Sequence, residues 1–393
     1  MAPERLALVA GEASGDLIAA QSLGQLLRAR SSRGGSLALE GIGGSHLRAL
    51  GMDCWHDAQR LAVRGYLEAL SRLGSILAIR RDVRARLISR PPRLFLGVDA
   101  PDFNLTLEAS LRREGIPTVH LVSPSIWAWR PERLRRIAEA VDHMLCLFPF
   151  EPDCYRETRV QAHYVGHPLA DLIPEAPDRG QARELLGMAA SARPILAVLP
   201  GSRDSEIRLV GEAFLGAACV LADRFEVLIP LASEELGPRL KALKSWPRAQ
   251  QRGVRLVGPV LPESCQVGRP ISHLVLQACE AALVASGTAT LEAALFKRPQ
   301  VIGYRVPALT YRMMRNKALV SRIGLPNLLV HPDLVPELVQ DDCEAVALAR
   351  ALESFVCDAA RVQRYENECR ALHERLKCNT ASRVATILDG LLK

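Results

Sequence analysis

Short runs of apolar residues alternate along the chain with longer stretches in which apolar side chains recur at helical spacing. A run of four or five aliphatic residues bounded by Gly, Pro or Asp is typical of a buried strand. In the stretch 206–224, by contrast, apolar residues recur every three or four positions, which predicts an amphipathic helix. The strands predicted in this way are 6–10, 94–98, 118–122 and 143–147 in the first half, and 195–199, 225–229, 254–257, 282–285 and 300–303 in the second.

This alternation of strands and helices predicts an α/β fold with parallel sheets covered on both faces. A segment with three prolines, GHPLADLIPEAPDRGQ (166–181), separates the two halves and predicts a hinge or stiff linker. We therefore expect two doubly wound, Rossmann-like domains that face each other across a cleft. The predicted divisions are an N-terminal domain, a linker, a C-terminal domain and a helical segment that packs back on the first domain: 1–170, 171–180, 181–340 and 341–393.

The basic side chains of the chain are almost all arginines. The formal net charge is +7, and six of the 50 Lys and Arg residues are lysines, which leaves 44 arginines. Because arginine pairs with phosphates and carboxylates in a bidentate manner, this excess is compatible with nucleic acid, a nucleotide or an anionic membrane surface as partner. A GC-rich genome would produce the same total. No nucleic-acid-binding motif is present, so we expect no nucleic-acid partner.

Several observations predict a cytoplasmic protein. No apolar run approaches the ~18 residues of a membrane span, and the first apolar stretch is too short for the core of a signal peptide. The ten cysteines include no C-x-x-C pair, which favours reduced thiols. No metal-ligand spacing is found around the histidines, and His120, His163 and His167 are interpreted as core or turn residues.

The first turn of interest is GEASGD (11–16), which follows the first predicted strand. It matches neither the G-x-G-x-x-G dinucleotide fingerprint nor a P-loop. Its glycines allow close approach of the backbone, and Ser14 or Asp16 could cap the following helix. On its own, this turn fits a capped strand–helix connection as well as part of an active site.

The second turn is LGVDAPDFN (96–104), in which Asp99 and Asp102 follow an apolar strand directly. Carboxylates at the carboxyl end of a strand are well placed to act as general bases. A helix cap and a tight turn explain the same two residues equally well. The spacing is D-x-x-D rather than D-x-D, so a metal–nucleotide site is not indicated.

The third turn is LPGSRDSEI (199–207), where Ser202 and Arg203 precede a predicted helix. Backbone N–H groups at a helix start, together with a cation, form an anion site. This pattern predicts that Arg203 holds a diphosphate.

The fourth turn is ASGTATLEAALF (285–296), in which Ser286, Gly287 and Thr288 precede a helix. Glu292 lies about one turn inside that helix. Donors at the turn suit a phosphate, and the carboxylate could accept hydrogen bonds from ribose hydroxyls, so the combination indicates a nucleotide site. A capped helix with an exposed Glu is the simpler alternative.

An arginine-rich segment, SPSIWAWRPERLRR (123–136), places Trp127 and Trp129 beside Arg130 and further arginines. The preceding stretch 71–90 alternates Leu and Ile with Arg. Trp and Arg along an apolar edge are typical of a surface at a lipid headgroup layer. A solvated helix and a buried Trp are the alternatives.

Eight motifs in order are AGEASGD, GVDAPDFN, SPSIWAWR, VGHPL, LPGSRDSEI, ASGTATLEAAL, VIGYR and LPNLLV. In this order they resemble the lipid-A-disaccharide synthase family, glycosyltransferases of family 19 with the GT-B fold. The resemblance extends from about residue 6 to the C-terminal helix. It implies an inverting transfer of the sugar of UDP-2,3-diacylglucosamine to the 6-hydroxyl of 2,3-diacylglucosamine 1-phosphate, which yields a β-1,6-linked disaccharide phosphate and UDP.

The resemblance also implies roles for single residues. Asp99 is expected to be the general base, and Glu12 and Asp16 are further catalytic candidates in the N-terminal domain. The substrate-binding residues that we expect are Ser14, Gly15, Asp102 and Asn104 on the acceptor side and Ser202, Arg203, Ser286, Gly287, Thr288, Glu292 and Asn327 on the UDP-sugar side. Trp127, Trp129 and Arg130 are expected to face the membrane.

The same resemblance implies a peripheral protein on the anionic cytoplasmic face of the inner membrane. It implies no metal or other cofactor, and a homodimer. Two alternatives remain at this point: another UDP-sugar enzyme of GT-B fold, such as a 2-epimerase or a transferase with a different acceptor, and an inactive relative that binds lipid or nucleotide.

Overall fold

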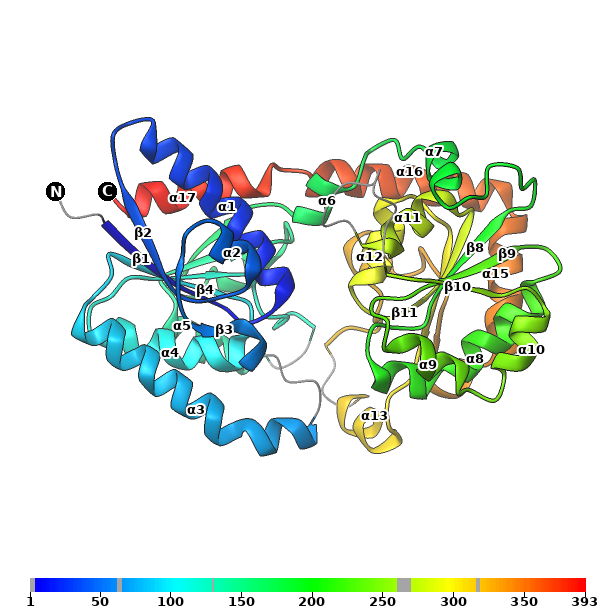
Figure 1. The fold of residues 1–393 in the computed structure, drawn as a ribbon, viewed down its shortest axis with the longest axis horizontal. Helices are drawn as coiled ribbons and strands as arrows, with labels where there is room; N and C mark the ends of the chain where they lie inside the picture. Colours follow the sequence, from blue (N-terminus) through cyan, green and yellow to red (C-terminus); the bar gives the residue numbers. More distant parts are fainter. Residues whose placement is uncertain (1–3, 62–65, 129–130, 260–269, 316–318) are drawn as a thin grey trace. The chain divides into compact units, whose positions relative to one another are not determined.

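A computed structural model describes residues 4–61, 66–128, 131–259, 270–315 and 319–393 of the chain. The chain forms two compact units (Figure 1). Unit 1 consists of Met1–Asp171 together with Arg375–Lys393, and unit 2 consists of Leu172–Glu374. None of the helices in the described part of the chain combines the length and the apolarity that a bilayer-spanning segment needs.

Unit 1 contains a seven-stranded parallel sheet with strand order β3-β2-β1-β4-β5-β6-β7. Its strands are β1 (Glu4–Ala10), β2 (Leu37–Gly43), β3 (Asp53–Asp57), β4 (Leu94–Val98), β5 (Thr118–Leu121), β6 (His143–Cys146) and β7 (Gln161–Tyr164). Its helices are α1 (Ala13–Ser31), α2 (Ser45–Ala49), η1 (Ala58–Arg60), α3 (Tyr66–Ser89), α4 (Pro101–Arg113), α5 (Arg133–Ala140), η2 (Glu151–Tyr155), α6 (Pro168–Leu172), which reaches the unit boundary, and α17 (Thr380–Leu391).

Alternate side chains of the central strands face two separate cores. Leu6 and Leu8 of β1 pack with α1 and α17, whereas Ala7 and Val9 pack with α3 and α4. Figure 1 shows these two helix layers on opposite faces of the sheet. Because both faces are covered, β1 and β4 need apolar residues at consecutive positions, which is the pattern seen in their sequences.

Unit 2 contains a six-stranded parallel sheet with strand order β10-β9-β8-β11-β12-β13. Its strands are β8 (Ile195–Leu199), β9 (Glu226–Pro230), β10 (Arg255–Val257), β11 (Ala281–Ala285), β12 (Gln300–Tyr304) and β13 (Glu337–Val339). Its helices are α7 (Arg179–Leu185), α8 (Asp204–Leu221), α9 (Leu236–Lys241), α10 (Trp246–Gln251), α11 (Ile271–Ala278), α12 (Thr288–Leu295), α13 (Ala308–Arg315), α14 (Leu325–Leu329), η3 (Gln340–Asp342), α15 (Ala345–Cys357) and α16 (Ala359–Leu376).

The nine strands predicted from aliphatic runs are all present, each to within two residues at either end. Four further strands, β2, β3, β7 and β13, were not predicted. Three of them are edge strands: β3 and β7 have polar sequences, such as DCWHD in β3, and β13 has only three residues. β2 contains Gly41, whose φ is +131° and where a Cβ would collide with the carbonyl oxygen of Leu8. Because β1 approaches so closely, this position of β2 requires glycine. Glycine interrupts the run of aliphatic residues by which a strand is predicted.

The C-terminal segment 341–393 is divided between the two units instead of packing as a whole on the first. In α15, Leu348 and Leu352 belong to the core that also contains α8 of unit 2. In α17, Val384 and Leu388 pack in the core that contains α1 of unit 1. Asp389 of α17 also pairs with Arg30 of α1 at 2.8 Å. The apolar faces of α15 and α17 therefore complete different sheets.

Candidate functional site

In unit 1, the turns after β1 and β4 lie at the same edge of the sheet because the two strands are adjacent and parallel. Ligands of open α/β sheets bind at this carboxyl edge. Asp99 and Ala100 have left-handed φ values of +51° and +43°. The buried side-chain amide of Asn104 donates a hydrogen bond to the carbonyl oxygen of Asp99 at 2.8 Å. Asn104 therefore stabilises the conformation of this turn. The sequence predicted a substrate contact for its side chain, and the burial of that side chain does not agree with this prediction.

Asp99 itself is half-buried at the start of this turn. Within the described residues, no hydrogen bond or ion pair engages its carboxylate, so the oxygens are available to a ligand. Asp102, three residues on, is exposed and pairs with Arg133 at 2.9 Å. Glu12 and Ser14 are also exposed, in the neighbouring turn after β1. These four residues are polar groups that the turns after β1 and β4 present at this edge.

Asp16 does not have the catalytic position that its motif suggested. Its side chain is buried, and its carboxylate accepts hydrogen bonds from the backbone N–H groups of Gly44 at 2.6 Å and His46 at 2.9 Å. Asp16 thus caps the start of α2. Gly15 is also structural, because a Cβ there would lie 3.2 Å from Cγ1 of Val98, so glycine lets α1 pack closely on β4.

A buried ion pair lies behind the Asp99 turn. Nδ1 of His120 is 2.8 Å from Oε1 of Glu108, and both side chains are fully buried. A Cβ on Gly97 would collide with the Glu108 carboxylate, so glycine at this position makes room for the pair. Burial lowers the pKa of His120, but the charge and hydrogen bond of Glu108 and the charge of Asp99 raise it by more, so the pKa is above its usual value. His120 could not be connected with Glu108 before the structure was known, because only the fold brings α4 against β5.

Trp127, which was expected to face the membrane, is half-buried and in contact with other residues of unit 1. Its indole N–H donates to Oε1 of Glu151 at 3.3 Å, and its ring packs edge-on against Phe148 and Phe150 at centroid distances of 6.4 and 5.1 Å. Burial raises the pKa of Glu151 to about 7, although the hydrogen bonds from Phe148 and Trp127 favour its charged form. Trp129 and Arg130, which were also expected to face the membrane, lie outside the described residues.

The pKa of Glu151 leads to a prediction for stability. The pKa of Glu151 is about 7 in the folded state and about 4.5 in the unfolded state. As the pH rises from 4.5 to 7, its contribution to the free energy of unfolding therefore falls, by about 3 kcal/mol in total. Burial lowers the pKa of His167 to about 4, so its contribution rises with pH up to about 6.5 and offsets that of Glu151. We expect the stability of Glu151→Gln, measured relative to the wild type by urea unfolding, to rise from pH 4.5 to 6.5. Parallel profiles for the two proteins would contradict this.

In unit 2, a cavity of about 610 Å³ lies at the carboxyl ends of β8, β9, β11 and β12. Its lining includes six residues that the sequence assigned to nucleotide binding: Ser202, Arg203, Ser286, Gly287, Thr288 and Glu292. Pro230, Leu231 and Tyr304 contribute to its other walls. The two separate turns of the sequence prediction therefore converge on one cavity. Its volume is in the range of small-molecule sites.

The turn after β8 differs from the expected anion site in one respect. The N–H groups of Ser202 and Arg203 donate to Oε2 of Glu206, at 2.8 and 3.2 Å. Glu206 therefore uses the backbone donors that were expected to bind a phosphate. The Arg203 guanidinium is 3.8 Å from the same carboxylate and largely exposed, so it is the positively charged group of this turn that can reach a ligand. Glu206 is the third residue of α8, a position from which a Glu side chain often accepts from N–H groups before the helix, and this signal was missed in the sequence.

The turn after β11 has the features of a phosphate site. Gly287 has a φ of +149°, which residues other than glycine rarely adopt. Helix α12 begins directly after it. The first N–H groups of a helix have no intrahelical partner and carry a partial positive charge. At this helix start Gly287, Thr288 and Ala289 line the cavity, together with Arg203 and Glu292. An anion at this helix start and a hydroxyl-bearing group near Glu292 would both find partners.

Asn327 does not line this cavity. It is buried, and its side-chain amide donates to Oε1 of Glu337 at 2.7 Å and to the carbonyl oxygen of Val335 at 2.9 Å. Glu337 in turn accepts from the N–H groups of Ile323 and Gly324. Asn327 thus belongs to a network that fixes the loop before α14, and the donor contact expected of it does not agree with this geometry.

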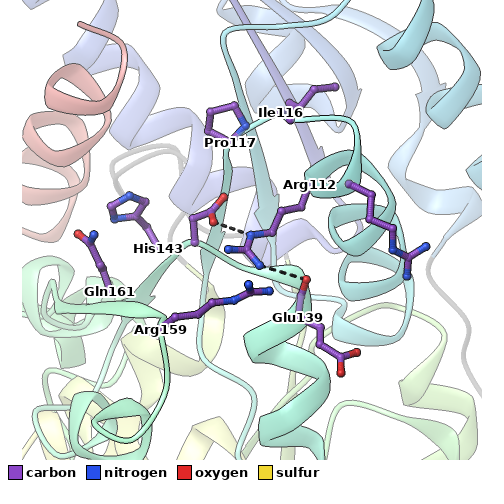
Figure 2. Close-up of a pocket in the computed structure, with 10 residues that line it drawn as sticks. Arg112, Ile116, Pro117, Glu139, His143, Arg159 and Gln161 are labelled. Atoms are coloured by element: carbon purple, nitrogen blue, oxygen red, sulfur yellow. Dashed lines mark hydrogen bonds and ion pairs between the residues drawn. The ribbon is translucent and has the colours of Figure 1, made fainter.

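A larger hollow of about 790 Å³ lies in unit 1 at the amino ends of β5, β6 and β7, at the edge opposite Asp99 (Figure 2). Figure 2 shows Arg112 bonded to two groups: its Nε donates to Asp142 at 2.6 Å and its Nη1 to the carbonyl oxygen of Glu139. Arg159 donates to the carbonyl oxygen of Ala138 at 2.9 Å. Glu139 and Ala138 lie at the end of α5, so these arginines complete the bonding of a helix terminus. We therefore place the candidate site at the carboxyl edges.

Within the described residues, no three His, Cys, Asp or Glu side chains come together in a group that could hold a metal ion. The chemistry available at the two edges is that of Asp99 and Glu12 in unit 1, and of a cation, a helix start and a carboxylate around one cavity in unit 2. These are groups for proton transfer and for binding a phosphorylated, hydroxyl-bearing ligand.

Comparison with solved structures shows the fold. Arabidopsis thaliana UGT89C1 complexed with UDP matches with a TM-score of 0.60, 13% identity and 100% coverage of both chains. The UDP-GlcNAc 2-epimerase from Neisseria meningitidis bound to UDP-GlcNAc matches with a TM-score of 0.59, 11% identity and 99% coverage of both chains. These likenesses identify two parallel-sheet α/β units of the kind found in GT-B glycosyltransferases.

Comparison of sequences shows the family. The model of the family described as lipid-A-disaccharide synthetase matches residues 6–388. The lipid-A-disaccharide synthase of Azoarcus sp. is 46% identical over 388 residues, which cover 98% of this chain and 95% of the relative. That of Cupriavidus pinatubonensis is 44% identical and covers 99% of this chain and 93% of the relative. The chain thus belongs to the lipid-A-disaccharide synthases, glycosyltransferases that act in lipid A biosynthesis.

Proposed function

We propose that the donor substrate is UDP-2,3-diacylglucosamine and the acceptor is 2,3-diacylglucosamine 1-phosphate. The observation that supports this most directly is the cavity of unit 2, where Arg203, the start of α12 and Glu292 meet. A nucleoside diphosphate has one group for each of them: a diphosphate for the cation and the helix start, and ribose hydroxyls for the carboxylate. Solved structures of the same fold contain UDP or UDP-GlcNAc.

In the proposed reaction, Asp99 accepts the proton of the acceptor 6-hydroxyl. The freed oxygen attacks the anomeric carbon of the donor on the face opposite the diphosphate, so the configuration inverts. The bond between the anomeric carbon and the diphosphate oxygen breaks, and UDP leaves with the electron pair. Negative charge grows on the diphosphate during this step, and Arg203 together with the start of α12 stabilises it. The proton remains on Asp99 until solvent removes it.

The test is to incubate the purified protein with both acylated sugars and to measure UDP release and the disaccharide phosphate by mass spectrometry. We expect UDP to appear only when both sugars are present, in a one-to-one ratio to disaccharide. Conversion of the donor without acceptor would favour an epimerase-like activity instead. Absence of any turnover, with UDP binding retained, would favour an inactive nucleotide-binding relative.

We also propose that the protein associates with the anionic cytoplasmic face of the inner membrane, because both substrates carry acyl chains. The described surface that supports this lies on α3, where Leu73 is half-exposed and Arg81 and Arg84 are exposed. Apolar and basic side chains on one helix suit an anionic lipid surface. Leu73→Asp is expected to reduce co-sedimentation with phosphatidylglycerol vesicles, whereas unchanged binding would exclude this surface.

The homodimer implied by the family resemblance is tested by sedimentation equilibrium.

A further inference from the structure

His273 lies in the first turn of α11, behind the wall of the unit 2 cavity. The two residues before it, Ile271 and Ser272, line the cavity. Its own side chain is 2% exposed. Neither ring nitrogen has a hydrogen-bond partner among the described residues. A neutral imidazole always carries one N–H, so a buried donor here is left without an acceptor, which is rare and costly in folded proteins.

One carboxylate lies close to this ring. Nε2 of His273 is 3.6 Å from Oε2 of Glu292, slightly beyond hydrogen-bonding distance. Glu292 lines the cavity, and its side chain is 16% exposed. The ring of Phe296 packs edge-on against the imidazole at a centroid distance of 5.4 Å and limits its rotation. A closer approach of the Glu292 carboxylate would therefore complete a hydrogen bond to Nε2.

We propose that His273 is a positioning residue for Glu292. When a nucleotide occupies the cavity, Nε2–H of His273 donates to the Glu292 carboxylate and fixes its plane. In that orientation the carboxylate accepts hydrogen bonds from both the 2′- and the 3′-hydroxyl of the ribose. This inference rests on the proposed nucleotide site. It explains how that site would distinguish ribose from 2′-deoxyribose.

The selection follows from the geometry of a carboxylate. A carboxylate that can rotate freely accepts a hydrogen bond from either hydroxyl, one at a time. A carboxylate that is fixed by a hydrogen bond from His273 presents both of its oxygens to the ribose at once. A site built to bond a particular hydroxyl discriminates strongly against an analogue that lacks it, because its polar group is left unpaired. Loss of the His273 donor should therefore affect the distinction between ribose and 2′-deoxyribose more than the binding of the rest of the nucleotide.

The experiment is to measure the binding of UDP and 2′-deoxy-UDP by titration calorimetry. We expect the wild-type protein to prefer UDP by at least about tenfold. In His273→Leu this preference should fall to about twofold or less, mainly through weaker binding of UDP. His273→Gln, whose amide nitrogen reaches the place of Nε2, should retain most of the preference, whereas the shorter His273→Asn should not.

His373 offers a matched control in the same unit. It is buried, its Nδ1 is 2.6 Å from Nζ of Lys297, and it does not line the cavity. His373→Leu should bind both nucleotides as the wild type does. An unchanged preference in His273→Leu, or an equal loss of both nucleotides, would overturn the role of His273. Failure of the wild type to bind UDP would overturn the nucleotide site itself, which is a separate result.

Discussion

Asp99→Asn is expected to lower kcat for disaccharide formation by a factor of about 10² to 10⁴, the range typical of a lost general base. Asparagine cannot accept the proton of the acceptor hydroxyl. It does tolerate the left-handed conformation of position 99, where φ is +51°. The fold and the affinity for UDP should therefore be unchanged. The measurement is steady-state kinetics with both acylated sugars, together with UDP titration of the same preparation.

Glu12→Gln is the matched comparison, because Glu12 is exposed in the neighbouring turn at the same edge of unit 1. If Glu12 only positions the sugar, its loss should raise KM for the acceptor and lower kcat less than about tenfold. The reverse ranking of the two variants would make Glu12 the base. Near-normal kcat in Asp99→Asn would remove Asp99 from the proton transfer.

Arg203→Ala is expected to lower kcat/KM for the donor by a factor of about 10² to 10³. The guanidinium is the positively charged group of the turn after β8 that can reach a ligand, and Glu206 already binds the backbone N–H groups of Ser202 and Arg203. Both the affinity for UDP and kcat should fall, since charge on the diphosphate increases as UDP leaves. Arg203→Lys should recover only part of the loss, because lysine does not bind a diphosphate in a bidentate manner.

Arg208→Ala provides the control for this prediction. Arg208 lies one turn further along α8, pairs with Asp204 at 2.7 Å, and is not among the residues that line the cavity. Its removal should change neither UDP affinity nor rate. If Arg203→Ala behaved in the same way as Arg208→Ala, the diphosphate would have to bind elsewhere in unit 2.

The fold and the convergence of two turns on the cavity of unit 2 were accessible from the sequence because they depend on local patterns. Fully buried strands such as β4 and β8 need consecutive apolar residues, so they are visible as aliphatic runs. The turns containing Arg203 and Glu292 each follow such a strand. Since parallel strands bring their carboxyl ends to one edge, the two turns had to approach each other.

Polar residues that serve the fold were harder to distinguish from those that face a ligand. Asp16 and Glu12 belong to one motif, but Asp16 is bonded to the N–H group of Gly44, which is remote in sequence. Asn104 and Asn327 likewise bind backbone groups inside their own units. His273 was missed because its relation to Glu292 exists only after α11 and α12 have packed together. Residue type and spacing do not contain this information.

The assignment of α17 to unit 1 has a consequence for synthesis of the chain. The strands of unit 1 and the whole of unit 2 leave the ribosome before α17 does. Unit 2 is continuous in sequence, so it can complete its fold while the apolar face of α1 still lacks Val384 and Leu388. Unit 1 therefore reaches its final core only after α17 has been translated. Until then, its exposed aliphatic surface is the part of the nascent protein most in need of a chaperone.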